Sequence, residues 1–215
     1  GVETTRIEMV PTANNPNETR APIRAMAMFD LDGVKTMVAA YTCTPLVTIS
    51  VDALEDGAHV VGNTVAELGY GNRPLEVLSL TAYNMERQPE QFVLVINREM
   101  SANLIKLEDL AAAPALTEPF GALGETLGSD GTHIPFAGIL QADDQDAQFI
   151  LTLRRNIDTG DVDLISSMKG VYFRLSDFVS GYTFPDYVYA ENQAGTQMFH
   201  NMLKPLEGYP ELVIE

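Results

Sequence analysis

The stretch Lys35–Leu54, KTMVAAYTCTPLVTISVDAL, decides the fold because a second stretch, Gln91–Leu110, QFVLVINREMSANLIKLEDL, follows the same pattern without a gap. Each stretch has an apolar run, a polar break, an alternating apolar run and an acidic-apolar end. Such alternation indicates a half-buried β-strand, so each stretch predicts a hairpin, and one hairpin used twice indicates a repeat architecture. The facing pairs are Thr36 with Phe92, Val38 with Leu94, Ala40 with Ile96, Ile49 with Ile105, Val51 with Leu107, and Leu54 with Leu110.

Further strands on either side of the first hairpin complete a unit of four. Pro22–Phe29 is a strand-like run before it, and His59–Leu68 is another after it. Asp32-Gly33 and Asp56-Gly57 supply the positive φ angles that tight turns need, so they are predicted to connect these strands. The unit is therefore an antiparallel sheet of four short strands.

Two further units begin at Pro74 and Pro135. Pro74 lies about 52 residues after Pro22, where the first unit begins, and Pro135 lies about 61 residues after Pro74. The first hairpin of the second unit is longer by four residues, Tyr83–Pro89, and the third unit follows the pattern more weakly. We expect one repeat-built domain over residues 1–215, with repeats at about 22–72, 74–131 and 135–184 and a tail at 185–215. In the tail, residues 190–203 predict a short helix.

Four short strands in each unit of about 40–60 residues are typical of a β-propeller blade. Over Pro22–Phe178 the chain resembles β-propeller repeat proteins in pattern, although it has no WD dipeptide or kelch di-glycine. The resemblance implies an all-β fold whose sheets stack round an axis, with the first strand of each unit innermost. Three units do not close a ring, so we expect an incomplete propeller or part of a larger one. The alternative is an open two-sheet β-sandwich with regular hairpins.

The charge of the chain excludes some partners. The formal net charge is −17, from 30 acidic and 13 basic residues, which argues against binding to nucleic acid or to an anionic membrane surface. No apolar run has the length of a membrane span, so we expect no membrane insertion. An acid-rich surface with few lysines, in a chain whose residue 1 is Gly, predicts a periplasmic or extracellular protein whose leader has been removed. A cytoplasmic location is the alternative.

The resemblance also implies where a site would lie, because propeller function gathers at the loops that enter the innermost strands. Those loops precede Pro22, Pro74 and Pro135, and they end in long polar or cationic side chains. The candidate ligand-binding residues are Arg20, Asn72, Arg73 and His133. If they converge, they form a site for carboxylate or phosphate. The alternative is that each arginine pairs with a local acid or caps a loop carbonyl.

These features predict a binding or interaction module that presents loops to a protein partner or a small anionic ligand. The alternative is an enzyme, or a periplasmic oxidoreductase subunit, with a metal or cofactor held at the channel mouth by His133 and Asp130. The chain has no recognisable catalytic motif, no metal-ligand spacing and no feature that names a cofactor. Cys43 is the only cysteine and is expected to be an inert, at least half-buried thiol.

Overall fold

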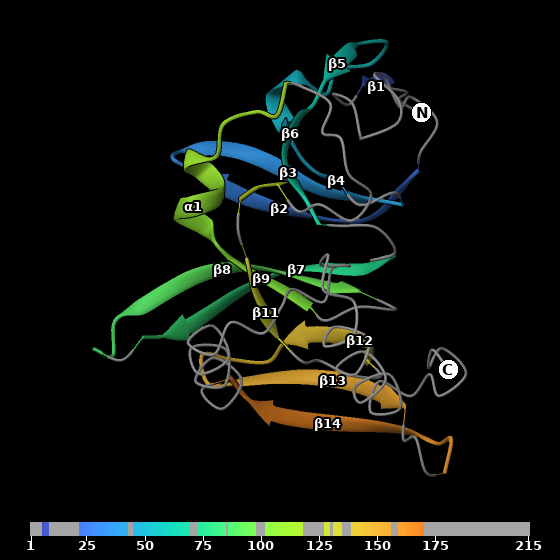
Figure 1. The fold of residues 1–215 in the computed structure, drawn as a ribbon, viewed down its shortest axis with the longest axis vertical. Coiled ribbons are helices and arrows are strands. Elements are labelled where there is room, and N and C mark those ends of the chain that lie inside the picture. Colours follow the sequence, from blue (N-terminus) through green and yellow to red (C-terminus); the bar gives the residue numbers. More distant parts are fainter. Residues whose placement is uncertain are drawn as a thin grey trace, which may run out of the picture.

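The computed structural model of the chain describes residues 6–8, 22–42, 45–68, 73–84, 86–97, 102–117, 127–129, 131–134, 139–155 and 159–169. Within these ranges the protein is built almost entirely of β-strands, so the prediction of an all-β fold is confirmed (Figure 1). The strands are β1 (Arg6–Glu8), β2 (Ile23–Leu31), β3 (Val34–Tyr41), β4 (Pro45–Ser50), β5 (His59–Val61), β6 (Asn63–Glu67), β7 (Pro74–Tyr83), β8 (Pro89–Asn97), β9 (Ala102–Lys106), β10 (Leu127–Gly128), β11 (Thr132–Ile134), β12 (Ile139–Asp144), β13 (Phe149–Arg155) and β14 (Val162–Met168). The helical segments are the 3₁₀ turn η1 (Val51–Ala53) and the helix α1 (Leu107–Ala112).

The strands form three antiparallel sheets and one short parallel ribbon. The first sheet has the order β10-β6-β4-β3-β2, the second β11-β9-β8-β7 and the third β12-β13-β14. The ribbon pairs β1 with β5 in parallel. The three sheets are separate and open, so the described residues do not form a closed ring.

The first two sheets have the same succession of elements. In each, three consecutive antiparallel strands are followed at once by a helical segment, which is η1 in the first case and α1 in the second. These helical segments fall on the acidic-apolar ends of the two matching stretches. The β2–β3 connection is the predicted turn: Asp32 and Gly33 have φ angles of 52° and 83°, and the Gly33 N–H donates to Asp30 Oδ1 at 2.7 Å.

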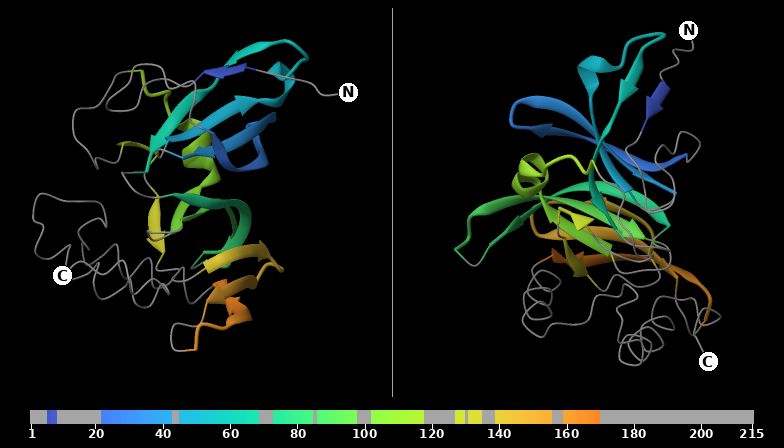
Figure 2. Two further views of the ribbon diagram at one scale, coloured as in Figure 1. Left: turned by 90° about the vertical axis from the view of Figure 1, so that its right-hand side faces the viewer. Right: turned by 45° about the horizontal axis from the view of Figure 1, so that its top comes forward.

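The second sheet lies between the other two, so the sheets form three layers (Figures 1 and 2). Its strand β8 is buried on both faces, because adjacent residues of a strand point to opposite sides. Val93 and Val95 pack in a core shared with the first sheet, whereas Leu94 and Ile96 pack in a core shared with the third sheet. Burial on both faces explains why the sequence of β8 contains a continuous apolar run.

A separate apolar layer covers the far face of the first sheet, where Met37, Ala39 and Ile49 pack with Val60 of β5. The last strand of the first unit is also shorter than predicted. The expected strand His59–Leu68 is divided into β5 and β6, which belong to different sheets.

Several predictions lie outside the described residues. They include the C-terminal helix at 190–203, the tail at 185–215, the end of the third repeat and Cys43. Within the described part, no helix is long and apolar enough to cross a membrane.

Candidate functional site

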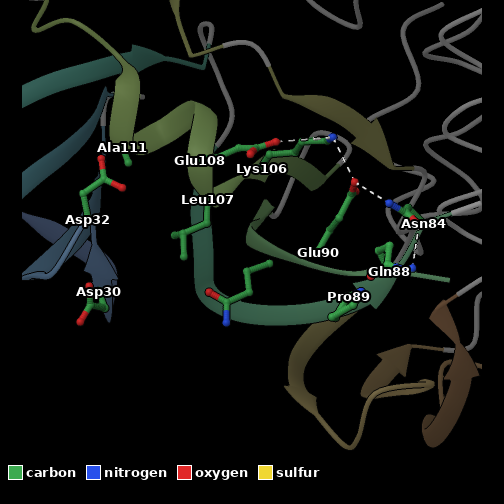
Figure 3. A pocket seen from close by; sticks show the side chains of 11 residues that line it. Asp30, Asp32, Asn84, Gln88, Pro89, Glu90, Lys106, Leu107, Glu108 and Ala111 are labelled. Atoms are coloured by element: carbon green, nitrogen blue, oxygen red, sulfur yellow. Dashed lines mark hydrogen bonds and ion pairs between the residues drawn. The ribbon is translucent and has the colours of Figure 1, made fainter. Parts of the chain in front are cut away.

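A pocket of about 440 Å³ opens between the first and second sheets, where hairpin ends and α1 meet. The turn of β2–β3 contributes Asp30 and Asp32, which lie across the gap from the residues of the second sheet (Figure 3). The remaining lining residues come from the β7–β8 hairpin and from the β9–α1 junction: Asn84, Gln88, Pro89, Glu90, Gln91, Lys106, Leu107, Glu108 and Ala111. Its volume is in the range that holds a small molecule or a few side chains of a partner.

The β7–β8 hairpin has its shape because of Asn84. The Asn84 side-chain oxygen accepts the backbone N–H groups of Glu86 and Gln88, both at 2.9 Å. Its amide nitrogen donates to Glu90 Oε1 at 3.1 Å. Arg87 takes a left-handed conformation, with a φ angle of 62°, to close the turn. One side chain thus organises the loop and orients an acidic group of the pocket.

The helix α1 places the other acidic wall. It begins directly after β9, and Leu110 anchors it, because that side chain is buried in the core between the first and second sheets. Glu108 and Asp109 lie in its first turn, where the positive end of the helix dipole favours carboxylates. The anchored helix therefore holds Glu108 at the pocket rim.

The pocket is acidic, since its described lining residues include four carboxylates and Lys106 as the only cation. Lys106 Nζ lies 3.4 Å from Glu90 Oε1 and 3.8 Å from Glu108 Oε1, so its charge is already matched. Figure 3 shows this row of ion pairs on one wall and Asp30 and Asp32 on the other. These partly exposed pairs are screened and contribute little to stability, but the pocket still has more hydrogen-bond acceptors than donors.

Such a site can hold an ammonium or guanidinium group, because carboxylate and amide oxygens accept hydrogen bonds from those donors. Across the described ranges, no three His, Cys, Asp or Glu side chains are grouped so that they could bind a metal ion.

The residues predicted from the sequence lie elsewhere. Arg20 and Asn72 are outside the described residues. Arg73 immediately precedes β7 and has a φ angle of 47°. His133 lies within β11, a strand paired with β9, rather than in the expected loop, because its backbone completes the edge of the second sheet.

Arg73 and His133 belong to opposite edges of the second sheet. Three strand spacings separate those edges, which is roughly 14 Å. Between them lies a buried amide pair, in which Asn97 Nδ2 donates to Asn103 Oδ1 at 2.8 Å. Asn97 pairs with Pro74, the neighbour of Arg73, and Asn103 pairs with His133. The anion site itself stays a prediction.

Sequence reasoning missed the acidic pocket, since it treated the longer β7–β8 hairpin as a difference in length alone. The available signal was Asn84 within that insertion, because an Asn followed by polar residues commonly accepts nearby backbone N–H groups. Comparison of the chain with protein-family models, with curated proteins and with solved structures found no match.

Proposed function

We propose that the protein is a binding module whose acidic pocket receives a cationic group, either of a small ligand or of a basic segment on a protein partner. The single observation that carries this proposal is the 440 Å³ cavity with four carboxylates and a lysine whose charge is already matched. Backbone elements of two sheets position opposite walls of the cavity, so the walls do not have to be assembled on binding. Preorganisation of this kind favours affinity.

The charge of the whole chain acts in the same direction. A formal net charge of −17 attracts cations over a distance of about one Debye length, which is about 8 Å at physiological ionic strength. Long-range attraction raises the association rate, and local carboxylates then determine where the cation lodges. A basic partner therefore fits this surface better than an acidic one. An anionic ligand would need the separate surface near Arg73 and His133.

The pocket lining favours binding over catalysis by an activated hydroxyl or thiol. Its described side chains are carboxylates, amides, one ammonium and apolar groups, with no Ser, Thr, Cys or His among them. A hydroxyl or thiol nucleophile activated by a neighbouring imidazole would need those residue types. The enzyme alternative, with a cofactor held by His133 and Asp130, stays a prediction.

We also propose that the three sheets are successive blades of a propeller-like array. Two observations support this idea: the first two sheets share one succession of elements, and the first strands β2, β7 and β12 are neighbours from sheet to sheet. The acidic pocket would then lie where hairpin ends of adjacent blades meet. A periplasmic or extracellular location remains the proposal that follows from the acidic, lysine-poor composition.

Calorimetric titration with agmatine, which carries one guanidinium and one ammonium group, tests the binding proposal. The double variant Asp32→Asn, Glu108→Gln should weaken agmatine binding about three- to tenfold, as expected for the loss of two exposed charge contacts. The control Asp52→Asn, Asp161→Asn removes the same charge from exposed positions outside the pocket. If both double variants weaken agmatine binding equally, the effect comes from net charge and not from the pocket, which would contradict the proposal. Tighter binding of glutarate than of agmatine would also contradict it.

A further inference from the structure

Lys169 is the buried lysine of the described chain, and its surroundings are unlike those of Lys35 and Lys106. Only 2% of Lys169 is exposed, whereas Lys35 is exposed and Lys106 is partly so. A buried ammonium is costly unless oxygen atoms replace its water. The contacts of this side chain therefore define a built site.

Three oxygen atoms surround the ammonium, and they come from two different sheets. Lys169 Nζ donates to the carbonyl oxygen of Thr81 at 2.8 Å and to that of Asp146 at 2.6 Å. Asp144 Oδ1 lies 2.5 Å away as an ion pair, although it is not aligned as a hydrogen bond. The ammonium therefore makes two hydrogen bonds and one ion pair, and these contacts replace the water that burial removes.

The backbone oxygen atoms are held in place by contacts that do not involve Lys169. Thr81 lies on β7, an edge strand of the second sheet, so a carbonyl that points outward has no ladder partner. Asp146 lies in the β12–β13 turn, where its side-chain oxygen accepts the N–H groups of Gln148 at 2.7 Å and Phe149 at 2.8 Å. That turn aims the Asp146 carbonyl toward the cage.

The backbone delivers the lysine to this cage. β14 ends at Met168, which pairs with Phe149, and the next residue continues the ladder, since the Lys169 N–H donates to Gln148 O at 2.8 Å. The side chain then crosses from the third sheet to β7 of the second. It joins two layers that otherwise meet mainly through apolar side chains.

We propose that the carbonyl oxygens of Thr81 and Asp146 and the carboxylate of Asp144 form a receptor for one primary ammonium group, and that the Lys169 ammonium in it locks the third sheet onto the second. The lock is local. Removal of the ammonium leaves two carbonyl groups and a carboxylate facing each other without a donor, so the third sheet should loosen before the first sheet does. This inference does not depend on the proposed function of the acidic pocket.

Hydrogen exchange and thermal unfolding of Lys169→Met test the lock, because methionine keeps most of the length and loses the charge. We expect the melting temperature to fall by roughly 10 °C, as is usual when one partner of a buried ion pair is removed from a domain of this size. Exchange of the amides at 145–149 should rise at least about tenfold, while that of β3 amides stays unchanged. Unaltered exchange at 145–149 would overturn the proposal.

Chemical rescue tests the receptor itself and uses Lys169→Ala. Propylammonium should raise the melting temperature of this variant in a saturable manner, whereas propanol and tetramethylammonium should not, because neither presents three N–H donors. Equal rescue by all three compounds would overturn the proposal. If neither variant folds, Asp144→Asn provides the test, because asparagine keeps an oxygen atom beside the ammonium. Amide exchange at 145–149 should then increase by less than about tenfold. An unchanged exchange rate in Asp144→Asn would overturn the proposal.

Discussion

The carboxyl group of Glu76 makes a further polar contact between the second and third sheets, and the effect of its titration on stability has a definite sign. Glu76 Oε2 accepts the backbone N–H of Ala142 at 2.7 Å. Ala142 is itself buried, and it lies on β12, an edge strand of the third sheet. Glu76 therefore satisfies an outward-pointing N–H group that the ladder with β13 does not use.

Two substitutions separate the hydrogen bond from the charge. Glu76→Ala removes the acceptor and leaves the Ala142 N–H unsatisfied, which should lower the unfolding free energy by about 1–3 kcal/mol. Glu76→Gln keeps an oxygen acceptor and removes the charge. Burial raises the pKa of Glu76 above its ordinary value of 4.5, the hydrogen bond from Ala142 lowers it, and the nearby Asp143 charge raises it, so the balance is upward.

The sign of the pH dependence follows from that balance. A carboxyl whose folded pKa is raised binds a proton more readily in the folded state than in the unfolded state. Its contribution to stability is therefore full at pH values below 4.5 and is lost as the pH rises through the raised folded pKa. Between pH 4.5 and the raised folded pKa, the unfolding free energy of the wild type should therefore fall relative to that of Glu76→Gln. At higher pH the difference between the two should stay constant.

Urea denaturation of the wild type and both variants between pH 4 and pH 8 measures these differences, and other titrating groups cancel in the comparison. We expect Glu76→Gln to be at least as stable as the wild type at pH 7. The difference in unfolding free energy between the two proteins should become smaller toward pH 4. A wild type that gains stability over Glu76→Gln as the pH rises would refute the reasoning. It would mean that the Ala142 hydrogen bond outweighs burial and the Asp143 charge.

Three further substitutions test individual layers. Leu94→Ala deletes a fully buried side chain between the second and third sheets and should cost about 2–5 kcal/mol in urea denaturation, with more exchange in the third sheet than in the first. Gly128→Ala should lower the unfolding free energy by at least about 1–3 kcal/mol, because its φ angle is +83° and a Cβ atom would meet the Val65 carbonyl oxygen; an equally stable variant would exclude this close approach. Asn84→Ala frees the β7–β8 hairpin and Glu90, so it should weaken agmatine binding while costing only about 1–2 kcal/mol of stability, and unchanged binding would remove this hairpin from the site.

The local pattern predicted most of the strands and both Asp-Gly turns, since Asp56 and Gly57 also form a turn in which Gly57 has a φ angle of 77°. Alternation and apolar runs located β3, β8 and β13 to within a few residues, since both signals report side chains that face a packed sheet. Asp32-Gly33 predicted the β2–β3 turn because few other dipeptides adopt two positive φ angles. The helix α1 was missed, as its sequence LEDL was interpreted as the end of a hairpin and offers only one turn of helical pattern.

The site was not predictable from local pattern. Asp32, Asn84 and Glu108 are far apart in sequence and meet only because the first and second sheets pack face to face. The length of the β7–β8 hairpin and the anchoring of α1 by Leu110 then decide which side chains line the gap. His133 illustrates the same limit: its place in β11 depends on a partner strand, β9, that is nearly thirty residues earlier.

The most direct test of the proposed function is to locate a bound cation on the isotopically labelled protein by nuclear magnetic resonance. Titration with agmatine should shift the amide signals of three segments that surround the pocket, at 30–33, 86–91 and 106–111. The shifts should saturate together, because one ligand contacts all three segments. Shifts that are absent from these segments, or that are confined to the region of Arg73 and His133, would contradict the account.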